Sequence, residues 1–154
     1  GAPAGPAHVA EAGQGGFGVN SDILRTAVRT TTPLLALLAI FLLLRGHDEP
    51  GGGFIAGLLF VSAVALHVLA FGVVASRRML RVDPRTLIGI GVALVASSGI
   101  LGLLAGRPFL TGLWGATIPG IGKLSSVLLF DIGVFLVVVG TVVLALFALE
   151  DEEV

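Results

Sequence analysis

Four long apolar runs, separated by short polar segments, dominate the pattern of this chain. About 20 apolar residues at 1.5 Å per residue cross a hydrocarbon core of about 30 Å, so each run is long enough to be a transmembrane helix. We predict these helices at residues 22–44, 54–75, 86–105 and 125–149. The pattern therefore predicts an all-α, polytopic membrane protein whose two termini lie on the same side of the bilayer.

The composition places the chain in the same class. Of its 154 residues, 55% are hydrophobic and 12% are charged, whereas a soluble domain carries about 25% charged residues. A net charge of −1 without a basic stripe argues against a nucleic acid partner. The absence of cysteine excludes disulfides and thiolate metal sites, and neither an H-E-x-x-H motif nor a complete phosphate-binding loop is present. We therefore expect membrane lipid and other membrane proteins as partners, and we expect no enzymatic activity, cofactor or metal.

The first 19 residues differ from the rest of the chain. They are rich in Gly, Ala and Pro, and only His8 and Glu11 are ionisable. Such a segment buries too little apolar surface to offset the entropy lost on ordering. We predict a flexible tail at 1–19 and a four-helix membrane domain at 20–154.

The basic residues indicate an orientation in the membrane. Six fall on the side of the termini: Arg25, Arg29, Arg77, Arg78, Arg81 and Arg85. Three fall on the opposite side: Arg45, Arg107 and Lys123. Because cytoplasmic loops carry an excess of Lys and Arg, both termini are predicted to be cytoplasmic.

A compact polar hinge joins the first two apolar runs. It reads Gly46, His47, Asp48, Glu49, Pro50, Gly51, Gly52, Gly53 and Phe54. Successive glycines let the backbone turn with positive φ and approach a neighbour closely, and Pro50 disfavours helical geometry at Glu49. His47 with Asp48 and Glu49 either binds a cation at this mouth or belongs to a solvated loop held by local hydrogen bonds.

Two ionisable residues lie inside predicted spans and are candidates for an ion or proton path. Asp131 lies a few residues inside the fourth span, where an aspartate costs about 2.5–3.5 kcal/mol and needs a partner. It is either a proton or cation site, or an acceptor for a backbone amide or an arginine of a neighbouring helix. His67 lies near the middle of the second span and either transfers protons or is hydrogen-bonded to a neighbouring helix.

Small residues predict close helix packing. Gly53 and Gly57 form a G-x-x-x-G pair, a spacing that lets another helix approach. Glycines also recur along the third and fourth spans. The candidate packing positions are Gly57, Gly99, Gly102, Gly133 and Gly140.

Two motifs give the chain a resemblance to the B-type member of the multisubunit sodium/proton antiporters known as Mrp or Mnh. The first is G-H-x-x-P-G-G-G-F, from Gly46 to Phe54, and the second is F-D-x-G-V leading to V-V-G, from Phe130 to Gly140. The resemblance covers about residues 25–150. It leaves residues 1–19 as either an unusual tail or the end of an upstream fused subunit.

The resemblance implies a heteromeric complex in the bacterial cytoplasmic membrane that exchanges sodium for protons. Its other members would be of A, C, D, E, F and G type, and the B-type subunit would be a small non-catalytic partner that supports assembly, with a further role on an ion or proton path left open. Similar subunits occur in membrane-bound hydrogenases and related ion-pumping oxidoreductases, which is the alternative assignment. A self-sufficient homo-oligomeric channel would need a polar stripe along one helix, which no span offers.

Overall fold

The computed structural model describes residues 21–46, 52–118 and 122–151. The predicted tail at 1–19 and the hinge residues His47, Pro50 and Gly51 lie outside this part of the chain. Within it the elements, in chain order, are α1 (Ser21–Arg45), α2 (Gly53–Phe71), α3 (Val73–Leu80), α4 (Pro84–Leu104), β1 (Trp114–Ile118), β2 (Gly122–Ser125) and α5 (Ser126–Asp151).

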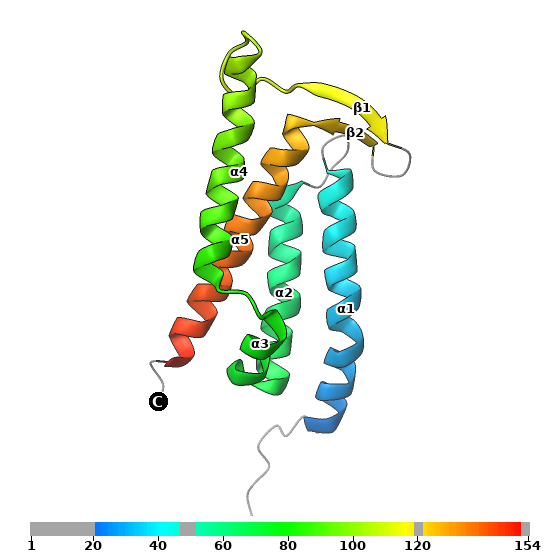
Figure 1. Ribbon diagram of the computed structural model, residues 1–154. Helices are drawn as coiled ribbons and strands as arrows, with labels where there is room; N and C mark the ends of the chain where they lie inside the picture. Colours follow the sequence, from blue (N-terminus) through cyan, green and yellow to red (C-terminus); the bar gives the residue numbers. More distant parts are fainter. Residues whose placement is uncertain (1–20, 47–51, 119–121, 152–154) are drawn as a thin grey trace, which may run out of the picture.

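Four long antiparallel helices make up the fold (Figure 1). Helix α1 packs on α2, α2 packs on α5, and α5 packs on α4, while α1 has little contact with α5. The start of α1 and the end of α5 lie at the same end of the bundle, next to α3 (Figure 1). Each long helix is apolar and long enough to cross a membrane, so the predicted all-α class with four transmembrane helices is confirmed.

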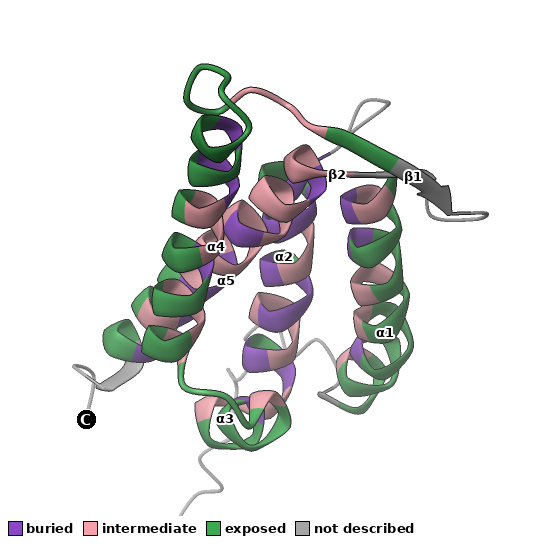
Figure 2. Cartoon of the chain, turned by 45° about the horizontal axis from the view of Figure 1, so that its top comes forward, coloured by how far each residue is buried: buried purple, intermediate pink, exposed green. Residues whose placement is uncertain are grey.

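The buried core lies between α2 and α5. Val61, Val64 and Val68 of α2 pack with residues of α5, and the buried residues concentrate along α2 in Figure 2. The α5 residues in this cluster are Val139, Val143 and Phe147. In contrast, large apolar side chains of α1 and α4 point outward, as expected for surfaces that face lipid or a partner helix.

The second predicted span is wrong at its end, because the helix stops at Phe71 and not at residue 75. Gly72 has φ +82°, a conformation that glycine adopts without steric cost. Its amide donates to Val68 O at 2.7 Å, which closes α2, and α3 then begins at Val73. The run of apolar residues continues across this break, so hydropathy alone does not reveal it.

The connection between α4 and α5 contains an antiparallel β-hairpin that the sequence did not predict. β1 and β2 pair with Trp114 opposite Ser125 and with Ile118 opposite Gly122. Ser126 anchors the approach to the hairpin, because its hydroxyl accepts from Leu113 N and its amide donates to Leu113 O, both at 3.0 Å. The hairpin lies at the end of the bundle opposite α3 (Figure 1).

Candidate functional site where α2 meets α5

The beginning of α2 contacts Asp131 on α5. Gly52 and Gly53 are buried, and a Cβ placed on Gly53 would overlap the backbone carbonyl oxygen of Asp131. A Cβ on Gly52 would lie 3.5 Å from Asp131 Oδ1, so the carboxylate faces this glycine. Because only a glycine backbone leaves this space, the glycine hinge and the Asp131 segment meet in one contact.

The contact places the carboxylate of Asp131 at the N-terminal end of α2. Gly52 has φ +94° and supplies no side-chain cap for the helix. The first amides of a helix have no intrahelical acceptor and carry a partial positive charge, so a nearby anion is favourable. Asp131, which is half-buried, therefore lies where the fold offers electrostatic compensation for a charge inside a span.

Two further hinge residues lie within the described chain. Gly46 closes α1, with its amide donating to Leu42 O at 2.9 Å, and Gly52 N lies 3.4 Å from the same carbonyl oxygen. Phe54 is 57% exposed and points away from the core. His47, Asp48, Glu49, Pro50 and Gly51 fall outside the described residues, so the predicted cation site there stays a prediction.

Three of the predicted packing glycines lie at helix–helix contacts. A Cβ on Gly57 would lie 2.9 Å from Val138 Cβ, and one on Gly133 would lie 2.8 Å from Gly91 O of α4. A Cβ on Gly140 would lie 2.7 Å from Pro84 O. The small residues thus allow α5 to contact both α2 and α4 at backbone distance.

Gly99 and Gly102 instead face the segment that follows α4. A Cβ on Gly99 would overlap the ring of Phe109, and one on Gly102 would lie 3.0 Å from Pro108 O. These two glycines therefore shape the turn that leads to the hairpin, within one end of α4.

His67 lies at the other end of α2 and has a partner on α3. Its Nδ1 is 2.8 Å from Ser76 Oγ, and the Ser76 hydroxyl donates to Gly72 O at 2.9 Å. Since this uses the single hydroxyl hydrogen, His67 Nδ1–H donates to Ser76 Oγ. The ring also packs on Phe71, with centroids 4.7 Å apart. Ser76 is fully buried, and sequence reasoning missed it because the contact depends on the break at Gly72.

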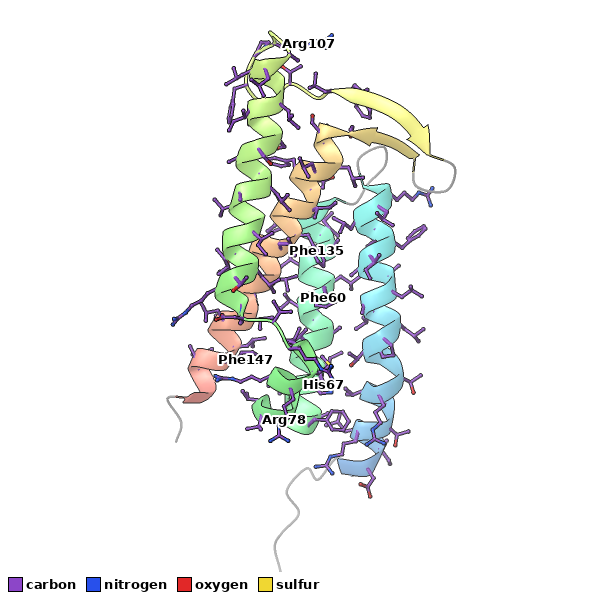
Figure 3. All side chains as sticks on the ribbon, viewed as in Figure 1. Phe60, His67, Arg78, Arg107, Phe135 and Phe147 are labelled. Atoms are coloured by element: carbon purple, nitrogen blue, oxygen red, sulfur yellow. The ribbon has the colours of Figure 1, made fainter. Side chains whose placement is uncertain are left out.

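The two candidate path residues are far apart. Asp131 lies beside Gly53, the first residue of α2. His67 lies 14 residues after Gly53 in the same helix, which is about 21 Å along the helix axis. Figure 3 shows His67 close to the end of the bundle that carries Arg78, away from the end that carries Arg107. The described part of the chain therefore does not bring Asp131 and His67 into one site.

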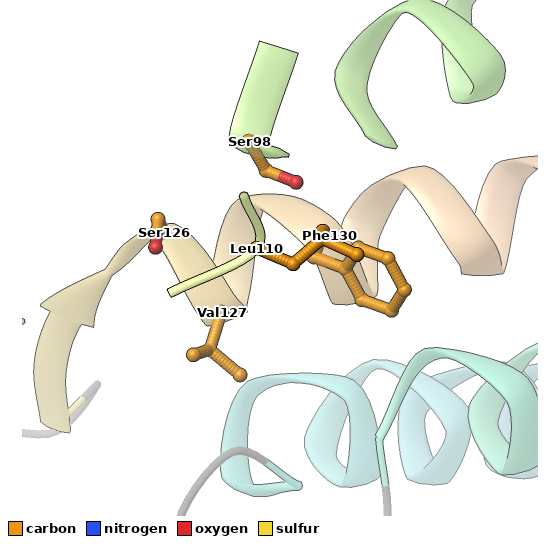
Figure 4. Close-up of a pocket in the computed structure, with 5 residues that line it drawn as sticks. All are labelled: Ser98, Leu110, Ser126, Val127 and Phe130. Carbon is orange, nitrogen blue, oxygen red and sulfur yellow. The ribbon is translucent and has the colours of Figure 1, made fainter. Parts of the chain in front are cut away.

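A small cavity lies near the start of α5. Ser98, Leu110, Ser126, Val127 and Phe130 line about 190 Å³ between α4, the following loop and α5 (Figure 4). The Ser98 hydroxyl donates to Val95 O, and Ser126 accepts from the loop as described above. The two hydroxyls hold local structure, and the described lining contains no ionisable residue.

Comparison with known proteins assigns the chain to a family. Residues 23–144 match the family model described as a domain related to the MnhB subunit of Na+/H+ antiporter. The chain belongs to this family. The B subunit of the Na(+)/H(+) antiporter from Bacillus subtilis is 36% identical over 87% of this chain and 96% of its own length.

Members of the MnhB-related family occur both as short chains and within long ones. The A/B subunit of a probable K(+)/H(+) antiporter from Rhizobium meliloti is 39% identical over 82% of this chain, but the match takes up 13% of that protein. A chain in the structure of the Mrp complex from Dietzia sp. DQ12-45-1b superposes with a TM-score of 0.71 at 34% identity. The superposition covers 82% of this chain and 14% of the Dietzia chain. The predicted resemblance to the B-type member of these antiporters is confirmed.

Proposed function

We propose that this chain is a non-catalytic, multi-pass subunit of a heteromeric, Mrp-type monovalent cation/proton antiporter in the bacterial cytoplasmic membrane. Its partners would be the A-, C-, D-, E-, F- and G-type subunits. The observation that carries the proposal is the contact between Gly53 and Asp131. It joins the two sequence motifs that carry the resemblance to the B-type antiporter subunits in a single structural unit.

The distribution of polar groups supports a role in assembly with larger transporting subunits. Asp131 and His67 lie at opposite ends of α2, so a continuous relay through the described residues would need groups from other subunits. The outer faces of α1 and α4 carry exposed large side chains such as Leu37, Phe41 and Ile90. Such faces contact either lipid chains or helices of other subunits.

We further propose that both termini face the cytoplasm. The bundle end that holds the start of α1 and the end of α5 also holds α3, with Arg77 and Arg78 (Figure 3). Arg107 lies at the opposite end (Figure 3). An excess of arginines at one end favours its cytoplasmic placement.

The proposal is tested by reconstituting antiport with and without this chain. Everted vesicles are prepared from a host that expresses the full set of antiporter subunits. The pH inside the vesicles is then followed with a pH-sensitive dye after addition of Na+ or K+. We expect antiport to vanish when this chain is omitted and to return when it is supplied. The purified chain alone in liposomes should give no cation-dependent pH change, and robust antiport by it would refute the proposal.

Asp131→Asn separates the two roles considered for the carboxyl group. Asparagine keeps the size of the side chain and one acceptor oxygen, but it carries no charge and cannot release a proton. If Asp131 transfers an ion or proton, the variant assembles normally and antiport is lost; if it only pins α2, antiport survives wherever assembly does. Asp22→Asn, at the exposed start of α1, is the matched control and should retain both assembly and antiport.

A further inference from the structure

The end of the bundle that carries α3 contains a basic cavity which the antiporter assignment does not use. Arg77 of α3, Arg81 at its end and Arg85 at the start of α4 line this cavity, whose volume is about 580 Å³. This volume lies in the range of small-molecule sites. Asp83 is the acidic residue in the lining, so three arginines and one aspartate give the lining a net charge of +2.

Four arginines at this end of the bundle fall into two groups. Arg25 donates to Ala70 O at the end of α2 at 3.3 Å, and Arg77 donates to Phe147 O near the end of α5 at 3.4 Å. The Arg77 guanidinium also stacks 4.8 Å from the Phe147 ring centroid. These contacts satisfy carbonyl groups at the ends of helices. Among the described residues, by contrast, the guanidinium groups of Arg81 and Arg85 make no hydrogen bond or ion pair.

The backbone at Arg81 is also unusual. Its φ of +52° lies in the left-handed region, and its amide closes α3 by donating to Arg77 O at 3.2 Å. Glycine is the usual residue at such a helix end. Here a guanidinium is placed at the cavity despite the steric cost of the left-handed conformation.

The cavity has a charged rim and an apolar wall. Leu144, Phe147 and Ala148 of α5 form the wall, a few residues before the span ends at Leu149. α4 enters the span at Pro84, so the arginines stand at the level where phospholipid headgroups meet the hydrocarbon core. A ligand that fits both surfaces carries an anionic group and an apolar chain.

We propose that this cavity binds the phosphodiester headgroup of an anionic phospholipid, with Arg81 and Arg85 holding the phosphate and an acyl chain lying along the apolar wall of α5. Basic pockets between transmembrane helices on the cytoplasmic side suit such headgroups. The cytoplasmic placement rests on the orientation given under the proposed function. The lipid would occupy the groove between α3, the start of α4 and the end of α5.

The test compares two double variants with equal charge changes. Arg81→Gln with Arg85→Gln removes both proposed phosphate ligands. Arg78→Gln with Arg107→Gln is the control, because neither residue belongs to the lining given for the cavity and Arg107 lies at the opposite end (Figure 3). The full chain, purified with its partner subunits in a non-ionic detergent, is titrated with phosphatidylglycerol or phosphatidylcholine, and bound lipid is counted by native mass spectrometry.

We expect wild type to prefer phosphatidylglycerol, and the first double variant to bind it about 25-fold more weakly, at roughly fivefold for each arginine. The control pair should stay within about twofold of wild type. Equal losses in the two pairs, or equal binding of the two lipids by wild type, would overturn the proposal. Displacement of phosphatidylglycerol by inorganic phosphate at constant ionic strength would assign the site to a soluble anion and also overturn it.

An acidic peptide is the competing occupant, since the acidic residues Glu150, Asp151, Glu152 and Glu153 follow the cavity wall in the sequence. Removing residues 150–154 should change lipid affinity by no more than about twofold if the lipid is the natural occupant. A rise of about tenfold or more would show that the acidic segment competes for the cavity, and would overturn the proposal.

Discussion

Replacing Gly53 by alanine tests whether the close contact between α2 and α5 exists in the folded protein. The added Cβ would overlap the carbonyl oxygen of Asp131, which belongs to the α5 backbone and cannot rotate away. The helices would have to separate locally, and forcing extra atoms into a packed interface costs about 1–3 kcal/mol. Alanine has a higher helix propensity than glycine, which offsets about 0.5–1 kcal/mol of this steric cost in the measured free energy of unfolding.

Gly89→Ala provides the matched control. Gly89 lies in α4, and a Cβ there meets nothing within 4 Å. The higher helix propensity of alanine should therefore raise the free energy of unfolding of Gly89→Ala by about 0.5–1 kcal/mol. Because both variants share the propensity gain, they should differ by the steric cost at Gly53, about 1–3 kcal/mol, which corresponds to roughly 5- to 140-fold in the unfolding equilibrium constant.

A third variant grades the effect. A Cβ on Gly57 would meet Val138 at 2.9 Å and Phe135 O at 3.4 Å. Because the side chain at this contact can yield more than a backbone can, Gly57→Ala should fall between the other two. The three free energies of unfolding are measured by SDS titration of the full chain in mild detergent, followed by circular dichroism. If Gly53→Ala unfolds at the same midpoint as Gly89→Ala, α2 and α5 do not meet in the way described.

Two further predictions concern single hydrogen bonds. Ser76→Ala removes the acceptor of the His67 Nδ1–H and should destabilise the chain by about 1–3 kcal/mol, whereas Ser62→Ala, whose exposed hydroxyl bonds only to its own helix, should be nearly neutral in the same titration. Asp83→Ala removes the side chain that accepts from Arg85 N at 2.8 Å and should cost about 0.5–2 kcal/mol. Asp83→Asn should recover most of that loss in thermal unfolding, and equal losses in the two Asp83 variants would show that the cap contributes nothing.

Hydropathy and helix length were enough to predict the four long helices. The runs later seen as α1, α4 and α5 each form one continuous helix, including the run that contains Pro33, so their pattern and their structure coincide. The predicted end of the second helix is wrong because Gly72 adopts φ +82° inside a continuous apolar sequence. A glycine in an apolar run can be either helical or a break, and the choice depends on contacts such as the one between His67 and Ser76.

The hairpin was missed for a related reason. Trp114–Ile118 and Gly122–Ser125 are only five and four residues long, and their pairing depends on where α4 and α5 place their ends. Ser126 fixes that geometry through two hydrogen bonds with Leu113. No local pattern in so short a segment distinguishes a strand from an irregular loop.

The candidate site shows what sequence and structure each contribute. The sequence singled out the glycine hinge and Asp131 separately, for their backbone freedom and for a charge inside a span. Only the fold shows that they are one contact, with the carboxylate beside Gly52 at the positive end of α2. A displacement of α5 at Asp131 would therefore change the contact with Gly52 and Gly53 at the N-terminus of α2.

Helix α2 connects the two ends of this protein. It begins against Asp131 and ends at the hydrogen bond between His67 and Ser76, which fixes α3 and the arginines that follow it. A change in charge at Asp131 alters the electrostatic balance at one end of a helix whose other end positions the basic cavity. Since α2 packs on both α1 and α5, any shift moves it against these helices, and the glycines at positions 53 and 57 are where movement against α5 is sterically limited. We expect variants at these glycines to change assembly and lipid binding together, whereas Asp131→Asn leaves the backbone contact intact.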